Sequence, residues 1–218
     1  MCDSCPKSGR EVLAIEPFYS ESNESWRAFF KKLKQRGVQK CALVISDAHQ
    51  GIQHAVKTEF TGTSWQRCKV HFMRNILAYV SPKSKALFSD RLKQIWLQKT
   101  YEDAHKQTVL LTETYQEIYP EAIACLEEGL EDSLQFFHFD FIDHRRISST
   151  NVLERLNKEI RRRSKVVGIF PSREAYLRLL TSYLIEYTEE WEVERSYIQP
   201  QKLELVMIKR EELLQSAA

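Results

Sequence analysis

The chain is poor in glycine, proline and cysteine, and it has no long hydrophobic run. Six glycines and six prolines among 218 residues, with 43% apolar residues, exclude a disordered chain. No apolar stretch approaches the roughly 20 residues that span a bilayer, and the first residues lack the apolar core of a secretory signal. Five cysteines at irregular spacing argue against a disulfide scaffold. We therefore expect a globular protein of a reducing compartment, large enough for one domain with an insertion.

The small net charge of +2 conceals two blocks of opposite sign. From Gln107 to Asp143 there is no lysine or arginine, whereas nine acidic residues occur there. From His144 to Lys165 there are eight lysines or arginines and only two glutamates. This asymmetry indicates a basic surface for a polyanion and an acidic face kept away from it. Two ordinary solvated helix faces are the alternative that charge alone leaves open.

The hydrophobic pattern of the first part predicts alternating strands and helices. We expect a strand at 11–18, a helix at 22–36, and a strand at 41–46 that is buried on both faces. A short helix running through Val56 follows, and then a strand that passes into a helix over 65–72. Such a βαβαβ-like order predicts a mainly parallel or mixed sheet.

The second part of the chain has the spacing of helices. Apolar residues over 86–134 recur at helical intervals without a strand signal, which predicts a helical insertion or subdomain. An irregular connection follows over 136–149. Further helices are expected from Asn151 to about Ser164 and over 171–191. The segment from 199 onward is charged and helix-prone, and we expect it to be loosely attached.

The run Ser149–Arg163 places acidic residues inside a basic helix. At 3.6 residues per turn, Leu153, Leu156 and Ile160 share one face and should pack on a core. An adjacent flank carries Glu154, Asn157, Lys158 and Arg161. A carboxylate ringed by cations suits a divalent metal held beside a phosphate backbone, although any DNA-binding helix could present the same flank.

Two carboxylates are the candidates for chemistry, and each has a structural alternative. Asp47 ends a buried strand, at the sheet edge where sites of open α/β folds lie, but it could simply cap a helix beginning near Ala48. Glu154 could close a capping box with Asn151. The two occur together, 107 positions apart and each within a distinctive motif, which favours a shared site over two separate caps.

Five segments carry a resemblance to a known family. They occur in order and at family-like spacing, and they resemble the Mutator-type transposases of bacterial insertion sequences over roughly residues 8–198. The segments are Gly9–Leu13, Leu43–Gly51, Trp65–Asn75, Ser149–Arg163 and Val166–Pro171.

The resemblance implies an α/β fold, a ribonuclease-H-like catalytic domain that is incomplete at its N-terminus and split by an all-helical insertion. On this basis we expect four parts: 1–80 and 141–198 form the catalytic domain, 81–140 is the insertion, and 199–218 is a charged tail. The family acts on DNA in bacteria, so the resemblance implies a cytoplasmic, nucleoid-associated protein.

The family uses two aspartates and one glutamate to hold divalent metal ions. By resemblance Asp47 is the second of these catalytic carboxylates and Glu154 the third, and both would be metal ligands. Hard oxygen ligands suit Mg²⁺, or Mn²⁺ in its place, which activates the nucleophile and stabilises the leaving oxygen in phosphoryl transfer.

The first carboxylate has no match in the sequence. In the family it lies on a strand well before the segment corresponding to Gly9–Leu13, and only ten residues precede Glu11 here. Asp3 is the only acidic residue among them, and we interpret it as part of a tail. We therefore expect an N-terminally truncated copy that is inactive alone.

Cys68 and His71 form a second family-like motif. Two ligands are few for zinc, and residues i and i+3 converge only if the strand turns helical between them. We expect His71 to act near the active site or a phosphate, with a packed core cysteine at Cys68 as the alternative. Cys2 and Cys5 lack a second pair and are interpreted as incidental.

Seven residues are candidates for sequence-independent contacts with DNA phosphates, and ordinary solvated helix faces are the alternative for each. They are Arg74, Asn75, Arg155, Lys158, Arg161, Arg162 and Arg163. The chain departs from the family at His144, where a tryptophan is usual, and at Val152, where a proline is usual. Loss of the tryptophan could weaken a stacking contact with DNA.

The sequence thus predicts a transposase catalytic-domain fragment, whose partners would be transposon-end and target DNA and a second copy or a full-length transposase. No membrane partner is expected. The alternative is a non-catalytic DNA-binding or dimerising remnant that modulates a full-length transposase. A third possibility is an unstable product with an exposed sheet edge.

Overall fold

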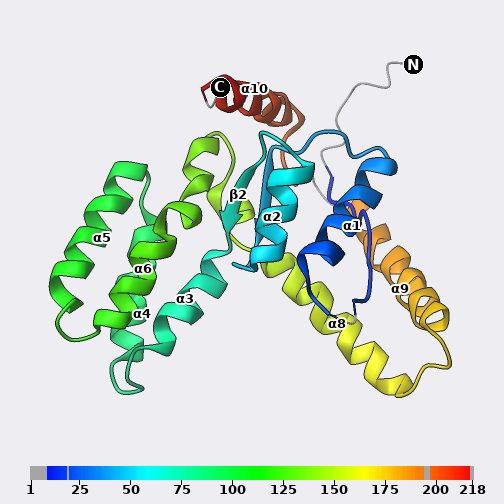
Figure 1. The fold of residues 1–218 in the computed structure, drawn as a ribbon, viewed down its shortest axis with the longest axis horizontal. Coiled ribbons are helices and arrows are strands. Elements are labelled where there is room, and N and C mark those ends of the chain that lie inside the picture. Colours follow the sequence, from blue (N-terminus) through cyan, green and yellow to red (C-terminus); the bar gives the residue numbers. More distant parts are fainter. Residues whose placement is uncertain (1–8, 19, 194–196, 217–218) are drawn as a thin grey trace. The chain divides into compact units, whose positions relative to one another are not determined.

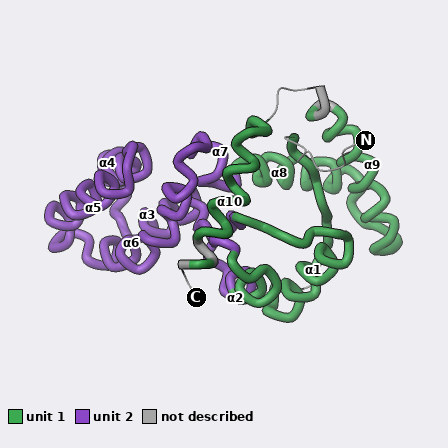
Figure 2. The backbone as a smooth tube through the Cα atoms, turned by 90° about the horizontal axis from the view of Figure 1, so that it is seen from above, with its two compact units in different colours: residues 1–42, 54–62, 151–218 green, residues 43–53, 63–150 purple. Residues whose placement is uncertain are grey.

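The computed structural model describes residues 9–18, 20–193 and 197–216, so Asp3, Cys2 and Cys5 lie outside the described residues. The chain divides into two compact units, coloured green and purple in Figure 2. Unit 1 comprises residues 1–42, 54–62 and 151–218, and unit 2 comprises residues 43–53 and 63–150. Helices dominate both units (Figure 1).

Unit 2 contains a small parallel sheet. Strand β1 (Leu43–Ser46) pairs in parallel with β2 (Ser64–Arg67), so that Leu43 lies opposite Ser64 and Ser46 opposite Arg67. Helix α2 (Gln50–Glu59) connects the two strands in sequence. This strand–helix–strand unit confirms the predicted order and the parallel pairing, and it fits an α/β fold.

Two predictions about strands were wrong. Residues 11–18 form no strand: Val12 and Ile15 pack against a cluster of buried helix residues, and the Leu13 carbonyl accepts a hydrogen bond from Arg36 (2.6 Å). Strand β1 is not buried on both faces, since only Ser46 is buried. Among the described residues the sheet has two strands, so β1 is an edge strand and has a neighbouring strand on one side.

Four helices complete the core of unit 2, as the helical spacing predicted. They are α3 (Lys69–Ala78), α4 (Lys85–Leu97), α5 (Tyr101–Tyr115) and α6 (Pro120–Ser133). Their fully buried side chains include Phe72, Phe88, Leu92 and Leu126. The connection expected to be irregular contains a 3₁₀ helix, η1 (Gln135–Phe139), and a short helix, α7 (His144–Ile147).

The sheet and the helices of unit 2 are joined by one buried glutamine. The Gln66 amide donates hydrogen bonds to the carbonyls of Arg67 (2.7 Å) and Ser133 (2.8 Å), and its oxygen accepts from the Phe136 N–H (2.8 Å). Because a buried amide is costly unless its hydrogen bonds are made, this residue fixes β2 against the end of α6.

Unit 1 is built from α1 (Asn23–Gln35), part of α2, α8 (Asn151–Val167), α9 (Arg173–Val193) and α10 (Pro200–Ser216). Helix α1 begins at the capping box of Ser22 and Ser25, and the chain turns at Gly37 with a φ of 102°. Both boundaries agree with the predicted helix.

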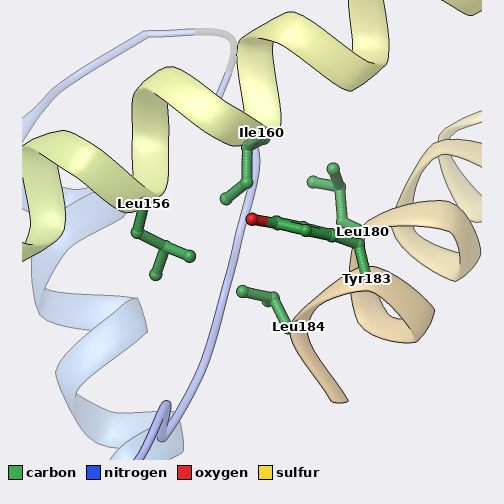
Figure 3. Packing of buried hydrophobic residues seen from close by; sticks show 5 residues of the cluster. All are labelled: Leu156, Ile160, Leu180, Tyr183 and Leu184. Carbon is green, nitrogen blue, oxygen red and sulfur yellow. The ribbon is translucent and has the colours of Figure 1, made fainter. Parts of the chain in front are cut away.

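Helices α8 and α9 meet over an apolar cluster, shown in Figure 3. Leu156 and Ile160 of α8 face Leu180, Tyr183 and Leu184 of α9. Leu153, predicted on the same face, is 54% exposed. Leu153 lies in the first turn of α8, outside the cluster. The row of apolar residues on α8 therefore extends beyond the part of the helix that α9 covers.

Helix α10 is held to the rest of unit 1, contrary to the loose attachment expected. The Arg210 guanidinium donates to the carbonyls of Cys41 (3.0 Å) and Thr61 (2.8 Å). These contacts join α10 to the segments before β1 and after α2. No helix among the described residues is long and apolar enough to cross a membrane.

Candidate metal and nucleic-acid site

Asp47 follows β1 directly and its side chain is exposed. Helix α2 begins only at Gln50, and the Gly51 N–H donates to His49 Nδ1 (3.1 Å). His49 therefore supplies the acceptor at the start of α2, and the alternative that Asp47 caps a helix beginning near Ala48 does not fit this structure. The Asp47 carboxylate forms no hydrogen bond or ion pair with any described residue.

Cys68 links three segments of unit 2. Its N–H donates to the Ser46 carbonyl (2.7 Å), and its buried sulfur accepts hydrogen bonds from the N–H and the hydroxyl of Thr150 (3.3 Å each). The Lys69 N–H donates to the Ser148 carbonyl (3.1 Å). The junction of β2 and α3 is thus hydrogen-bonded to Ser46, the residue before Asp47, and to Thr150, the residue before α8.

His71 lies in the first turn of α3, one turn after Cys68. The chain turns helical at Lys69, and this turn brings the Cys68 sulfur and a His71 ring nitrogen within 4.8 Å of each other. The thiol is occupied as a hydrogen-bond acceptor, which fits the core-cysteine interpretation of Cys68. His71 itself is half-buried.

Glu154 is a half-buried residue near the start of α8. The helix begins at Asn151, so Thr150 takes the capping position and Leu153 the third helical position. A capping box of Asn151 with Glu154 does not fit this boundary. Glu154 instead lies one position beyond the third helical residue, in the first turn of α8.

The cations of α8 fall into two groups. Arg162 donates to Glu159 (3.0 Å), and Arg163 lies near Glu159 (3.6 Å) and Glu186 (3.7 Å) with its guanidinium 4.1 Å from the centre of the Tyr183 ring. The hydrogen bond from Arg162 lowers the pKa of Glu159. Both arginines are thus paired with carboxylates of unit 1, and Arg155 lines the same pocket as Arg163.

The other group lies on the flank of Glu154. Lys158 and Arg161 are exposed, and Lys165, which the sequence analysis did not single out, continues the same flank one turn later. None of the three forms an ion pair or hydrogen bond with a described residue. The spacing of Lys165, four positions after Arg161, was the signal that could have identified it.

On α3, the predicted phosphate contacts Arg74 and Asn75 are exposed. With its amide oriented to fit its neighbours, Asn75 accepts a hydrogen bond from Arg67 (3.3 Å) and donates to the His71 carbonyl (3.2 Å). Asp47, His71, Arg74 and Asn75 thus all belong to unit 2, whereas Glu154 and the α8 cations belong to unit 1.

His144 lies within an aromatic cluster of unit 2. Its ring lies 4.7 Å from the Phe136 ring and 5.1 Å from the Phe137 ring, measured between ring centres. Burial lowers the pKa of His144. The side chain therefore serves packing in this unit, as a neutral aromatic ring.

Comparisons with known proteins agree with these motifs. The family profile described as "Transposase, Mutator family" matches residues 6–194. The transposase for insertion sequence element IS256 in transposon Tn4001 of Staphylococcus aureus is 40% identical over 184 residues, which are 84% of this chain and 47% of that protein. The transposase for ISRM5 of Rhizobium meliloti is 35% identical over 189 residues, 87% of this chain and 48% of that protein.

The transposase for IS1081 of Mycobacterium tuberculosis is also 35% identical over 189 residues, 87% of this chain and 46% of its own length. The chain spans about half the length of the curated relatives it matches. The profile match extends over most of the chain and includes both Asp47 and Glu154. By this match the chain belongs to the Mutator family of transposases.

Proposed function

We propose that this chain supplies two metal-binding carboxylates and a basic helix to metal-dependent DNA strand cleavage and transfer at transposon ends. The observation that carries the proposal is Asp47. It is an exposed carboxylate without a partner among the described residues, at the carboxyl end of a parallel strand, and it does not cap the helix that follows. That edge of an α/β sheet is where such folds place their sites.

The donor atoms fit the expected metal. The carboxylates of Asp47 and Glu154 are hard oxygen ligands, and Asp47 is exposed. Mg²⁺ or Mn²⁺ bound there would supply Lewis acidity to the scissile phosphate. The sulfur of Cys68 accepts two hydrogen bonds from Thr150, so we assign Cys68 a structural role and do not count it among the metal ligands.

The remaining residues have supporting roles in the proposal. Lys158 and Arg161, with Lys165, bind the DNA backbone through phosphates, because they are exposed and carry no internal partner among the described residues. Arg74 and Asn75 would add contacts from α3. His71 is assigned a position near the reacting phosphate, where its ring could donate a hydrogen bond.

Manganese binding tests the metal site directly. Titration of the 218-residue chain with Mn²⁺, followed by electron paramagnetic resonance of the free ion, should reveal a site that Asp47→Asn and Glu154→Gln each weaken roughly tenfold or more. Asp90→Asn is the matched control, because Asp90 is an exposed carboxylate on α4 that pairs with Lys93 (2.9 Å). Equal affinity in all four proteins would refute the assignment.

Strand transfer separates this function from its alternative. The family motif matches two of three carboxylates to this chain, so we expect no strand transfer by the 218-residue polypeptide with Mg²⁺ and transposon-end DNA. Turnover by the chain alone would show that expectation to be wrong. A remnant that only modulates a full-length transposase would bind duplex DNA with the same affinity whether or not Mn²⁺ is present.

A further inference from the structure

The connection between α8 and α9 exposes apolar side chains at its tip. Ile169 is 92% exposed and Val166 83% exposed. Gly168 ends α8 in the left-handed region, with a φ of 76°, and its N–H donates to the Ser164 carbonyl (3.3 Å). Large apolar residues exposed this far, and close together in the sequence, are typical of interaction sites.

The base of this tip is anchored on unit 1. Phe170 turns inward and packs edge-to-face on Tyr176, with 5.0 Å between ring centres. The Ser172 hydroxyl accepts the Ala175 N–H (3.1 Å) at the start of α9, and Arg173 donates to Glu16 (2.8 Å). Ile169 is therefore presented on an ordered support, which reduces the conformational entropy lost when it is buried by a partner.

The charges beside the tip indicate what the partner is. Lys158, Arg161 and Lys165 lie on one flank of α8, span about 10.5 Å of its axis, and have no ion-pair partner among the described residues. By contrast Leu110, 54% exposed on α5, lies in a segment without any lysine or arginine. A DNA duplex complements both features. Its anionic phosphates match the cations, and the flat faces of its base pairs are apolar, as the tip is.

We propose that Ile169, flanked by Val166, is a wedge that inserts between base pairs and kinks the DNA held by the cations of α8. The inference rests on the proposed function only in requiring that α8 binds DNA. Proteins that insert isoleucine, leucine or phenylalanine between base steps offset the cost of unstacking by the added contact with bent DNA. Ile169 would give the domain a preference for duplexes that unstack easily.

Binding to matched and mismatched duplexes tests the wedge. Fluorescence anisotropy would compare a labelled 30-bp duplex with the same duplex carrying a two-base mismatch, which is already partly unstacked. Wild-type protein should bind the mismatched duplex about tenfold more tightly. Ile169→Ala should lower this ratio to about one, and Ile169→Leu should retain it. Leu110→Ala, the matched control, should leave it unchanged.

Other variants keep the two proposals separate. Lys165→Gln should weaken binding to both duplexes equally, because a phosphate contact does not sense base stacking. Ile169 is exposed, so its variants should unfold at the wild-type temperature. Tight binding without a mismatch preference would overturn the wedge and leave the phosphate contacts intact. Absence of binding at low salt would overturn both.

A contact between two copies of the chain is the competing explanation for the exposed tip. Sedimentation velocity would detect it. Self-association that Ile169→Ala abolishes, together with equal binding to the two duplexes, would replace the wedge by a protein interface.

Discussion

The salt dependence of DNA binding should distinguish the two groups of cations on α8. We predict that changing Lys158, Arg161 and Lys165 together to glutamine removes most of the salt dependence contributed by this helix, whereas changing Arg162 and Arg163 removes little. The reason is their pairing: the first three have no ion-pair partner among the described residues, and the other two are bound to Glu159 and neighbouring groups. Glutamine keeps the helix propensity and much of the side-chain stem.

The magnitude follows from counterion release. Each phosphate neutralised contributes about 0.9 to the slope of log K against log salt. Three independent contacts therefore amount to about 2.7, which corresponds to roughly a fortyfold loss of affinity between 50 and 200 mM salt. The triple variant should lack this loss. The double variant of Arg162 and Arg163 should retain it, because a guanidinium already paired with a carboxylate releases few counterions from DNA.

Fluorescence anisotropy at four or five salt concentrations measures these slopes on one arbitrary duplex. Glu159→Gln provides a further check, since it frees Arg162 and removes a carboxylate close to Arg163, and should steepen the slope. The reasoning is refuted if the triple and the double variants lose the same slope. It is also refuted if Glu159→Gln leaves the slope unchanged.

Two predictions concern packing in unit 2. Gly129→Ala should destabilise the protein by about 1–2 kcal/mol despite the better helix propensity of alanine. The new Cβ would lie 2.8 Å from the Phe72 ring and would clash with the Arg67 guanidinium stacked on that ring. An unchanged or raised Tm would contradict this. His144→Phe should make stability less sensitive to pH. Burial lowers the pKa of His144 in the folded state, so protonation favours unfolding and stability falls as the pH drops below about 6.5. Denaturant unfolding at pH 7.5 and 5.5 measures this, and an equal fall in the variant would contradict it.

Periodicity predicted the helices well because the apolar residues of a helix recur every three or four positions along the sequence. The boundaries of α1 agree with the helix predicted at 22–36, which is followed by Gly37. The strand expected at 11–18 failed for a different reason. A short apolar run does not reveal its partner, and Val12 and Ile15 pack on helices instead of pairing with a strand.

The candidate site depended on details too fine for the sequence to resolve. A helix starting at Ala48 would have made Asp47 a plausible cap, and the same helix starting at Gln50 makes it an exposed carboxylate. A shift of two residues lies within the uncertainty of any boundary read from a pattern. The motif could therefore associate Asp47 with metal chemistry, but only the structure removed the capping alternative.

The cations of α8 show why charge alone left the DNA surface undecided. A helical count places Arg161 on the flank of Glu154 and Arg163 on another side of α8, but it does not show what pairs with either. Arg163 lies near Glu186 and stacks on Tyr183, both of which come from α9 and lie 20 or more positions away in sequence. A charge that is neutralised by the fold contributes little to binding a polyanion, so the useful quantity is the number of cations without an internal partner. On that measure the flank of α8 proposed to bind phosphate is the one that also carries Glu154, so the proposed metal ligand and the proposed backbone contacts share one side of a single helix.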